Sequence, residues 1–588
     1  MSYALIVITV FLALNLLAGL LRGGADTGSA APGERFASGG RGFGGFALFA
    51  TLAATNFSAY TVFGLSGAGF RLGWAWYPAM GFGTGLMALS FLAVGLPVRR
   101  FARERGWATQ GALVAGRLGS SALGKSLSLF LLVLTVPYLA AQGIAAGRLL
   151  ESALGLPYAA GSALILGVAT AYVLAGGMRA VVRTDVLQLG VLAAVVAAAF
   201  FVVARVGGGL EAVSRVLDAE KPALLSTEGD GAGLGALALA GTWLLWLLAD
   251  PMFPQLFHRF GVAKDERALR VSAALYPLAT SFVFLFPVAA GVVGAALLPG
   301  LDAKGAENVF HSLARSAGGE TLGALFVVGA LAALLSTLDS QLLAVASIVV
   351  EDFMPRRKSK SAAYRVVAAL AALAAWLVSL DPPASILDFL NRAAFPGYAA
   401  AAPVVLLALY APRLGAAPAW AALASGAALV ALEAFGLFVP PLPAAVFNLL
   451  AQDLAVAATA GALSFARRFR LLPANAEVGA RLGASGGGAT GAMAPGAGEP
   501  AAVAPVPGLP EAPVRLFEHL APLTLARVAL VVAAALAVRL LPWPPTRFAG
   551  LPVWVWAWLA LGGLLAAALA PSLSPSSTLR TPPPTPRR

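Results

Sequence analysis

Apolar residues fill long runs of this chain, and short polar stretches separate the runs. A helix needs about 20 residues to cross the ~30 Å hydrocarbon core of a bilayer. Runs of this order predict thirteen spans up to residue 465, at 2–21, 45–70, 73–97, 124–150, 158–175, 185–205, 233–257, 270–298, 320–350, 363–380, 393–411, 416–438 and 443–465. Two further runs, 522–541 and 551–570, predict a helical hairpin. The pattern is that of an all-α polytopic membrane protein.

Basic residues gather in alternate loops between these spans. They occur at 99–105, 179–183, 259–270, 356–360, 413 and 467–470, whereas the other loops include the acidic stretches 207–230 and 299–318. Loops rich in Lys and Arg lie on the cytoplasmic side. The alternation predicts a multi-pass protein of the inner (cytoplasmic) membrane with its N-terminus outside. The net charge of +13 then reflects topology, and no nucleic-acid-binding motif accompanies it.

Composition supports this assignment and narrows the chemistry. Hydrophobic residues make up 59% and charged residues 11%, against about 25% charged in soluble domains. There is no Cys, which excludes disulfides and Cys-ligated metals. The three His are scattered without metal-ligand spacing, and no nucleophile or phosphate-loop motif occurs. The sequence therefore does not favour an enzyme.

One predicted span, within 329–352, carries a row of polar residues in its middle: Ser336, Thr337, Asp339, Ser340 and Gln341. Each such group costs free energy in hydrocarbon unless a partner satisfies it, so this helix faces a protein interior. Ala333 lies one turn before the two hydroxyls of Ser336 and Thr337, so three neutral oxygens can converge. That donor set suits a hard cation that must bind and leave. The alternative is that the hydroxyls bond back to their own helix and only pack neighbours.

The span at 45–70 contains a second group of polar residues, Thr55, Asn56, Ser58 and Tyr60, followed by three Gly. This composition predicts a helix that breaks within the membrane. Unpaired backbone at that depth is tolerated only where it lines a cavity or binds an ion. A broken helix offers free carbonyls to a cation and free amides to an anionic group. The alternative is a polar patch that packs against a neighbouring helix.

A third segment, GGMRAVVRTDVLQ at 176–188, reads as a loop that re-enters the membrane. It has a Gly pair, two Arg for the cytoplasmic rim, and Asp185 at the expected start of the next helix. An Asp at a helix start is commonly a cap.

Three segments together resemble the sodium/solute symporter family. They are the GG-x₂-AV-x₂-TD-x₂-Q segment at 176–188, LLSTLDSQLL at 334–343 and PQLFHRFGVAK at 254–264, and the resemblance runs from about 40 to 465. It implies a LeuT-like inverted-repeat (5+5) transporter core, in which the spans at 45–70 and 233–257 are the two broken helices. The run from Ala54 to Met80 is most similar to the monocarboxylate and pantothenate branch.

The resemblance also implies the site residues. Sodium (Na⁺), the coupling ion, is expected at the backbone carbonyls of Ala54, Phe57 and Ala333 and at the hydroxyls of Ser336 and Thr337. Asp185 is expected near the inner sodium exit. Matching positions imply a solute site between the two broken helices, lined by Asn56, Ser58, Tyr60, Tyr138, Gln142 and Trp246.

Two positions depart from the family pattern. Asn56 stands where proline carriers have an acidic residue, which weakens the case for a proline site. Asp250 replaces an expected aromatic residue. An intramembrane Asp is a functional candidate by default. We expect Asp250 either to serve proton coupling or to pair with Arg259.

With the resemblance, the chain divides into six segments. We expect an N-terminal transmembrane helix and cytoplasmic loop at 1–44, a ten-helix core at 45–411, two additional transmembrane helices at 412–472, a flexible linker at 473–513, a transmembrane hairpin at 514–572 and a disordered tail at 573–588.

The predicted function is sodium-coupled symport of a small organic solute across the lipid bilayer by alternating access. A monocarboxylate is the first expectation for the solute, and pantothenate and proline are the alternatives. A transporter-like solute sensor is a further alternative, motivated by the linker and the C-terminal helix pair.

Overall fold

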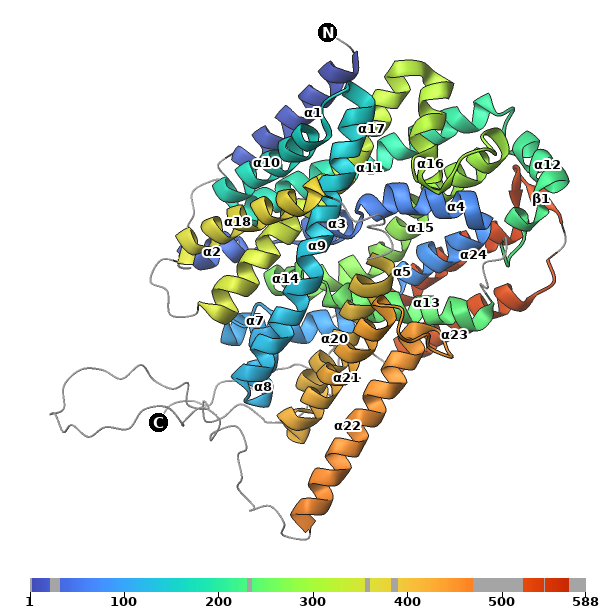
Figure 1. Ribbon diagram of the computed structural model, residues 1–588. Coiled ribbons are helices and arrows are strands. Elements are labelled where there is room, and N and C mark those ends of the chain that lie inside the picture. The colour runs from blue at the N-terminus through green and yellow to red at the C-terminus, as the bar shows by residue number, and fades with distance from the viewer. Residues whose placement is uncertain are drawn as a thin grey trace, which may run out of the picture.

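The computed structural model describes residues 3–21, 32–229, 235–354, 360–381, 390–468, 522–543 and 545–570 (Figure 1). The predicted linker at 473–513 and tail at 573–588 lie outside these residues. In the described part, eleven helices are long and apolar enough to cross a membrane, or up to thirteen if each of two bent pairs counts as one span. The larger of these two numbers agrees with the thirteen spans predicted up to residue 465.

Two groups of helices make up the centre of the molecule, and each packs mainly within itself. The first group contains four spans: α3 (Gly45–Asn56) with η1 (Tyr60–Gly64) and α4 (Leu65–Leu72); η3 (Pro78–Phe82), α5 (Gly83–Gly85), α6 (Ala88–Ser90), η4 (Phe91–Gly95) and α7 (Leu96–Arg105); α13 (Ala236–Ala249) with η6 (Asp250–Met252) and α14 (Pro254–Val262); and α15 (Glu266–Leu297). The second group contains α9 (Ser121–Leu154), α10 (Tyr158–Gly176), α17 (Val309–Ile348) with η7 (Val349–Phe353), and α18 (Lys360–Leu380).

The remaining helices connect or surround these groups. Two spans contact both groups, α11 (Met178–Val206) and the pair η8 (Leu390–Ala394) with α20 (Phe395–Tyr410). At the periphery lie α1 (Tyr3–Leu20), α21 (Ala416–Ala434) and α22 (Ala444–Arg468). The short elements are α2 (Pro32–Ser38), η2 (Gly73–Ala75), α8 (Gln110–Leu118), α12 (Leu210–Glu220), η5 (Pro222–Leu225), α16 (Ala303–Glu307) and η9 (Pro412–Leu414).

Two spans of the first group are broken, as predicted for 45–70 from its polar residues and for 233–257 from the family resemblance. The segment Gly45–Asn56 meets Tyr60–Ala75 at an angle of 63°, and Ala236–Met252 meets Pro254–Val262 at 59°. The first break falls at Phe57 and Ser58, where Phe57 is extended with φ −83° and ψ 98°. The second falls at Phe253, just before Pro254, because proline disfavours helical backbone in the residue that precedes it.

The segment at 176–188 differs from the expected re-entry loop. A single residue, Gly177 with φ +54°, separates α10 from α11. The helix α11 begins at Met178, so Asp185 lies about two turns inside it and the prediction that it opens the helix was wrong. The stretch expected as the acidic loop 299–318 is also largely helical: it contains α16 and the start of α17, which bends at Gly318 and Gly319.

The C-terminal hairpin consists of α23 (Pro522–Leu540) and α24 (Val553–Leu569), and the antiparallel strands β1 (Arg547–Phe548) and β2 (Leu551–Pro552) lie between them. In Figure 1 this red hairpin lies on the side of the molecule opposite to α1 and α10. The helix α24 packs against α15, and its Trp558 side chain contacts the rings of Phe82 and Trp243 at 5.6 and 5.7 Å between centroids. The hairpin therefore covers the first helix group.

Candidate functional site

A group of buried oxygens lies where the break of the first broken span meets α17. The Ser336 hydroxyl oxygen lies 2.8 Å from the Ala54 carbonyl oxygen and 3.0 Å from that of Ala333. The Thr337 hydroxyl lies 3.1 Å from the Thr55 carbonyl oxygen and 3.4 Å from that of Phe57. The five residues expected to bind sodium thus lie together, and none is more than 1% exposed.

The break in the helix explains why these carbonyls are accessible. The last carbonyls of a helix have no intrahelical partner. Because α3 ends at Asn56, carbonyl oxygens at its end accept from side chains of α17 instead. The oxygens come from α3 in the first helix group and α17 in the second, so the site joins the two groups.

A buried charge network lies next to this site. Arg259 of α14 donates from Nη2 to Asp185 Oδ2 at 3.1 Å and from Nε to the Thr51 hydroxyl at 2.8 Å. Thr51 in turn donates to the same Asp185 oxygen, and Arg259 also donates to the Ser340 hydroxyl. Asp185 is therefore a charged partner between helices rather than a cap. Arg259 pairs with Asp185, so the expectation that it pairs with Asp250 was wrong.

Asp339 adds a second carboxylate to this network. Its oxygens accept from the hydroxyls of Tyr172 at 2.7 Å and Thr184 at 3.2 Å, and Oδ1 lies 2.9 Å from the Ser340 hydroxyl. Both carboxylates are fully buried; Arg259 forms an ion pair with Asp185 and is connected to Asp339 through the Ser340 hydroxyl. Neither Asp339 nor Arg259 was predicted as a site residue. Asp339 nevertheless belongs to the row of polar residues in the middle of α17.

A separate small cavity lies between the two breaks. The predicted residues Asn56, Ser58, Tyr60, Tyr138 and Trp246 line it. The Tyr138 hydroxyl lies 3.2 Å from the Ser58 hydroxyl, and the rings of Tyr60 and Trp246 are 6.3 Å apart. The free volume is only about 20 Å³, which is room for little more than one water molecule. The predicted solute site is therefore closed in this conformation.

Gln142, which the resemblance implies as a solute-site residue, contacts the backbone at the first break. Its side-chain oxygen accepts the backbone amide of Ala59 at 3.2 Å, and it does not line the cavity. The break leaves this amide without a helical partner, so Gln142 stabilises the broken backbone.

Further residues that the sequence did not indicate also line the cavity. Phe395, at the start of α20, lies 5.0 Å from the Trp246 ring and 5.6 Å from the Tyr60 ring. Phe253 lies at the second break and contacts both Phe395 and Tyr138. The Pro396–Gly397 pair could have indicated irregular backbone beside Phe395, because such pairs often mark turns.

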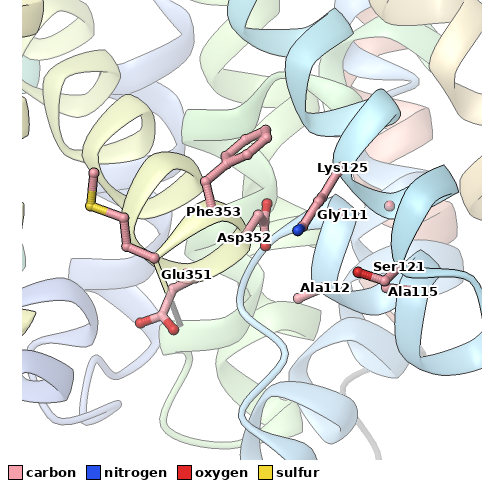
Figure 2. Close-up of a pocket in the computed structure, with 10 residues that line it drawn as sticks. Gly111, Ala112, Ala115, Ser121, Lys125, Glu351, Asp352 and Phe353 are labelled. Atoms are coloured by element: carbon pink, nitrogen blue, oxygen red, sulfur yellow. The ribbon is translucent and has the colours of Figure 1, made fainter. Parts of the chain in front are cut away.

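A wider cavity of about 770 Å³ lies away from both breaks, among α8, the start of α9 and η7 (Figure 2). Figure 2 shows Glu351 and Asp352 on one side of it and Lys125 and Ser121 on the other. The Asp352 carboxylate accepts from the hydroxyls of Thr109 and Ser128, each at 2.6 Å. None of the predicted site residues lines this cavity.

Comparisons with known proteins identify the family of this chain. The model of the sodium:solute symporter family matches residues 36–426. A sodium/pantothenate symporter of Escherichia coli (strain K12) is 29% identical over 443 residues, which cover 70% of this chain and 88% of that protein. The osmoregulated proline transporter OpuE of Bacillus subtilis (strain 168) is 29% identical over 419 residues, which cover 67% of this chain and 81% of that protein.

A solved Na⁺-coupled sialic acid symporter in a substrate-bound outward-open state has the same fold. The TM-score is 0.62 at 17% identity, and the match covers 78% of this chain and 97% of that structure. The broken spans, the two helix groups and the family match over residues 36–426 lead to one conclusion. The chain belongs to the sodium:solute symporter family, and it is a multi-pass membrane protein with a LeuT-type inverted-repeat core and additional helices at both ends.

Proposed function

We propose that this protein imports a small organic solute together with sodium, and that sodium binds among Ala54, Phe57, Ala333, Ser336 and Thr337. The observation that carries the proposal is the convergence of these buried oxygens at the first break. They are neutral oxygen donors, which suit a hard cation of low charge because no fixed carboxylate holds the ion too tightly to leave.

The position of the site supplies a means of coupling. The carbonyls of Ala54 and Phe57 belong to the same break as the side chains of Asn56 and Ser58, which line the cavity. A cation that orders this backbone also orders the solute site. The two ligands then favour the same conformation, and each raises the affinity for the other by the same factor.

Transport requires the two helix groups to move relative to each other. The cavity is too small for a solute, so the rings of Tyr60, Trp246 and Phe395 must separate before one can bind. The sodium oxygens come from both groups, and bound sodium therefore favours one of their relative arrangements. The proposed role of Asp185 near the inner exit, the location in the inner membrane and the outside N-terminus complete this proposal.

The test is uptake of labelled solutes into proteoliposomes with and without an inward sodium gradient. We expect Ser336→Ala combined with Thr337→Ala to abolish sodium-stimulated uptake, because two of the five ligand oxygens are lost. Ser347→Ala is the matched control, since Ser347 is buried on the same helix and its hydroxyl bonds only to the Leu343 carbonyl. Unchanged sodium dependence in the folded double variant would contradict the sodium assignment.

The solute panel includes pyruvate, lactate, acetate, pantothenate and proline. A monocarboxylate is the first expectation from the sequence, with pantothenate and proline as alternatives. Gradient-dependent accumulation of one of them would establish symport and identify the solute class together. The Asp250 side chain in the cavity changes the order of these expectations.

A further inference from the structure

Asp250 places a carboxylate at the solute cavity. It begins η6, within the second broken span, and it is fully buried and lines the cavity. One oxygen, Oδ2, accepts from the Asn56 side-chain amide at 3.3 Å. The other oxygen, Oδ1, is buried and has no hydrogen-bond partner among the described residues. One acceptor in the cavity is thus available to a ligand.

No cation among the described residues pairs with this carboxylate. In the described part of the chain, no Lys, Arg or His forms an ion pair with Asp250. Arg259 forms its ion pair with Asp185 instead. The other polar neighbours, Asn56 and the Tyr276 hydroxyl that contacts it, carry no positive charge. A buried carboxyl oxygen without a partner is poorly solvated, so a ligand that brings a positively charged hydrogen-bond donor would supply the partner that the described residues do not.

Two further unpartnered groups line or border the same cavity. The indole N–H of Trp246 and the Thr84 hydroxyl are buried and have no hydrogen-bond partner among the described residues. The indole can only donate. The cavity therefore offers an acceptor at Asp250 and a donor at Trp246, between aromatic rings whose faces attract cations.

We propose that the solute carries a positively charged nitrogen, which binds the Asp250 carboxylate, and that Trp246 donates to an acceptor group elsewhere on the same solute. An amino acid or a betaine has this pattern. A simple monocarboxylate does not, because it has neither a positive charge nor a hydrogen-bond donor for the free Oδ1 of Asp250. The inference rests on the proposed symport function and specifies its substrate class.

The experiment compares solutes that differ only in the charged nitrogen. The pairs are L-proline with cyclopentanecarboxylate, L-alanine with propionate, 4-aminobutyrate with butyrate, and glycine betaine with 3,3-dimethylbutanoate. Binding of each to the purified full chain in sodium buffer is measured by thermal stabilisation, because a ligand that binds the folded state raises the unfolding temperature. We expect at least one nitrogen-bearing member to bind about 30-fold or more tightly than its matched carboxylate.

The same pairs are then measured with Asp250→Asn, which keeps the shape of the side chain and removes its charge. We expect the preference for the charged nitrogen to fall by about 30-fold or more. Asp352→Asn is the matched control, because it neutralises another buried carboxylate that lies outside the solute cavity. It should leave the preference unchanged.

Three results would overturn the proposal: no nitrogen-bearing member binds, a matched carboxylate binds equally well, or Asp250→Asn keeps the preference. The comparison of pairs in the unmodified protein stands even if the variant does not fold. Stabilisation by sodium alone, and its loss in the Ser336→Ala, Thr337→Ala variant, is scored separately. Failure of the substrate inference is thereby distinguished from failure of the symport proposal.

Discussion

At the scale of single residues, Arg259 is the cation on which the buried network depends. It pairs with Asp185 and contacts Ser340, which also lies next to the Asp339 carboxylate. Removing one member of a buried ion pair costs about 3–5 kcal/mol, because the other charge is left unpaired. We expect Arg259→Gln to destabilise more than Asp185→Asn, since the first leaves two buried carboxylates and the second leaves one carboxylate with one cation.

Thermal unfolding of the purified variants in detergent measures this difference. The double variant Arg259→Gln, Asp185→Asn should be more stable than the sum of the single effects predicts, because the two residues share one interaction. Equal midpoints for the two single variants would show that Asp339 does not depend on Arg259.

At the scale of elements, the contact between α4 and α15 depends on glycine. A Cβ atom added at Gly291 would lie 2.1 Å from the Ser66 carbonyl oxygen, and one at Gly69 would lie 2.3 Å from that of Val288. Both obstacles are backbone atoms, which cannot rotate away. We expect Gly291→Ala to destabilise the protein by about 1–3 kcal/mol by forcing the two helices apart.

The matched control is Gly167→Ala, in the interior of α10, where a Cβ atom would meet nothing within 4 Å. Alanine favours a helix over glycine by up to about 1 kcal/mol, so this variant should be as stable as the unmodified protein or more stable. The thermal midpoints of the two variants provide the comparison, and a neutral Gly291→Ala would show that α4 and α15 have room to separate.

At the scale of the whole molecule, the C-terminal hairpin is attached to the rest of the protein but contributes no residue to the proposed sodium and solute sites. The Ser214 hydroxyl donates to the Gly550 carbonyl at 2.7 Å, and the Trp554 indole donates to that of Leu225 at 3.2 Å. Trp558 is 1% exposed. Deletion of residues 473–588 should therefore lower the unfolding temperature and leave sodium-dependent uptake in the molecules that remain folded.

Uptake normalised to folded protein tests this expectation, with Trp558→Ala as a milder variant that removes one packing contact and keeps the chain intact. A deletion variant that still binds sodium and solute but accumulates no solute would contradict a self-sufficient transport core. That result would favour the sensor alternative.

The sequence by itself determined the spans, the position of the first break and the presence of buried polar residues beside it. These properties are local. A run of about 20 apolar residues predicts a membrane span, and polar residues beside glycines predict a break in the helix. Ser336 and Thr337 could be identified as candidate site residues because hydroxyls in hydrocarbon need a partner. The family assignment followed from short segments, and the match over residues 36–426 confirms it.

Only the tertiary structure decided which distant groups meet. Asp185 and Arg259 are 74 positions apart, and their pairing depends on how α11 and α14 pack around α3. The sequence did not show that Gln142 binds the Ala59 amide, or that Arg259 pairs with Asp185 and not with Asp250. Bend angles and helix crossings arise from packing between residues far apart in the chain, so a local pattern specifies that a charge is buried but not what neutralises it.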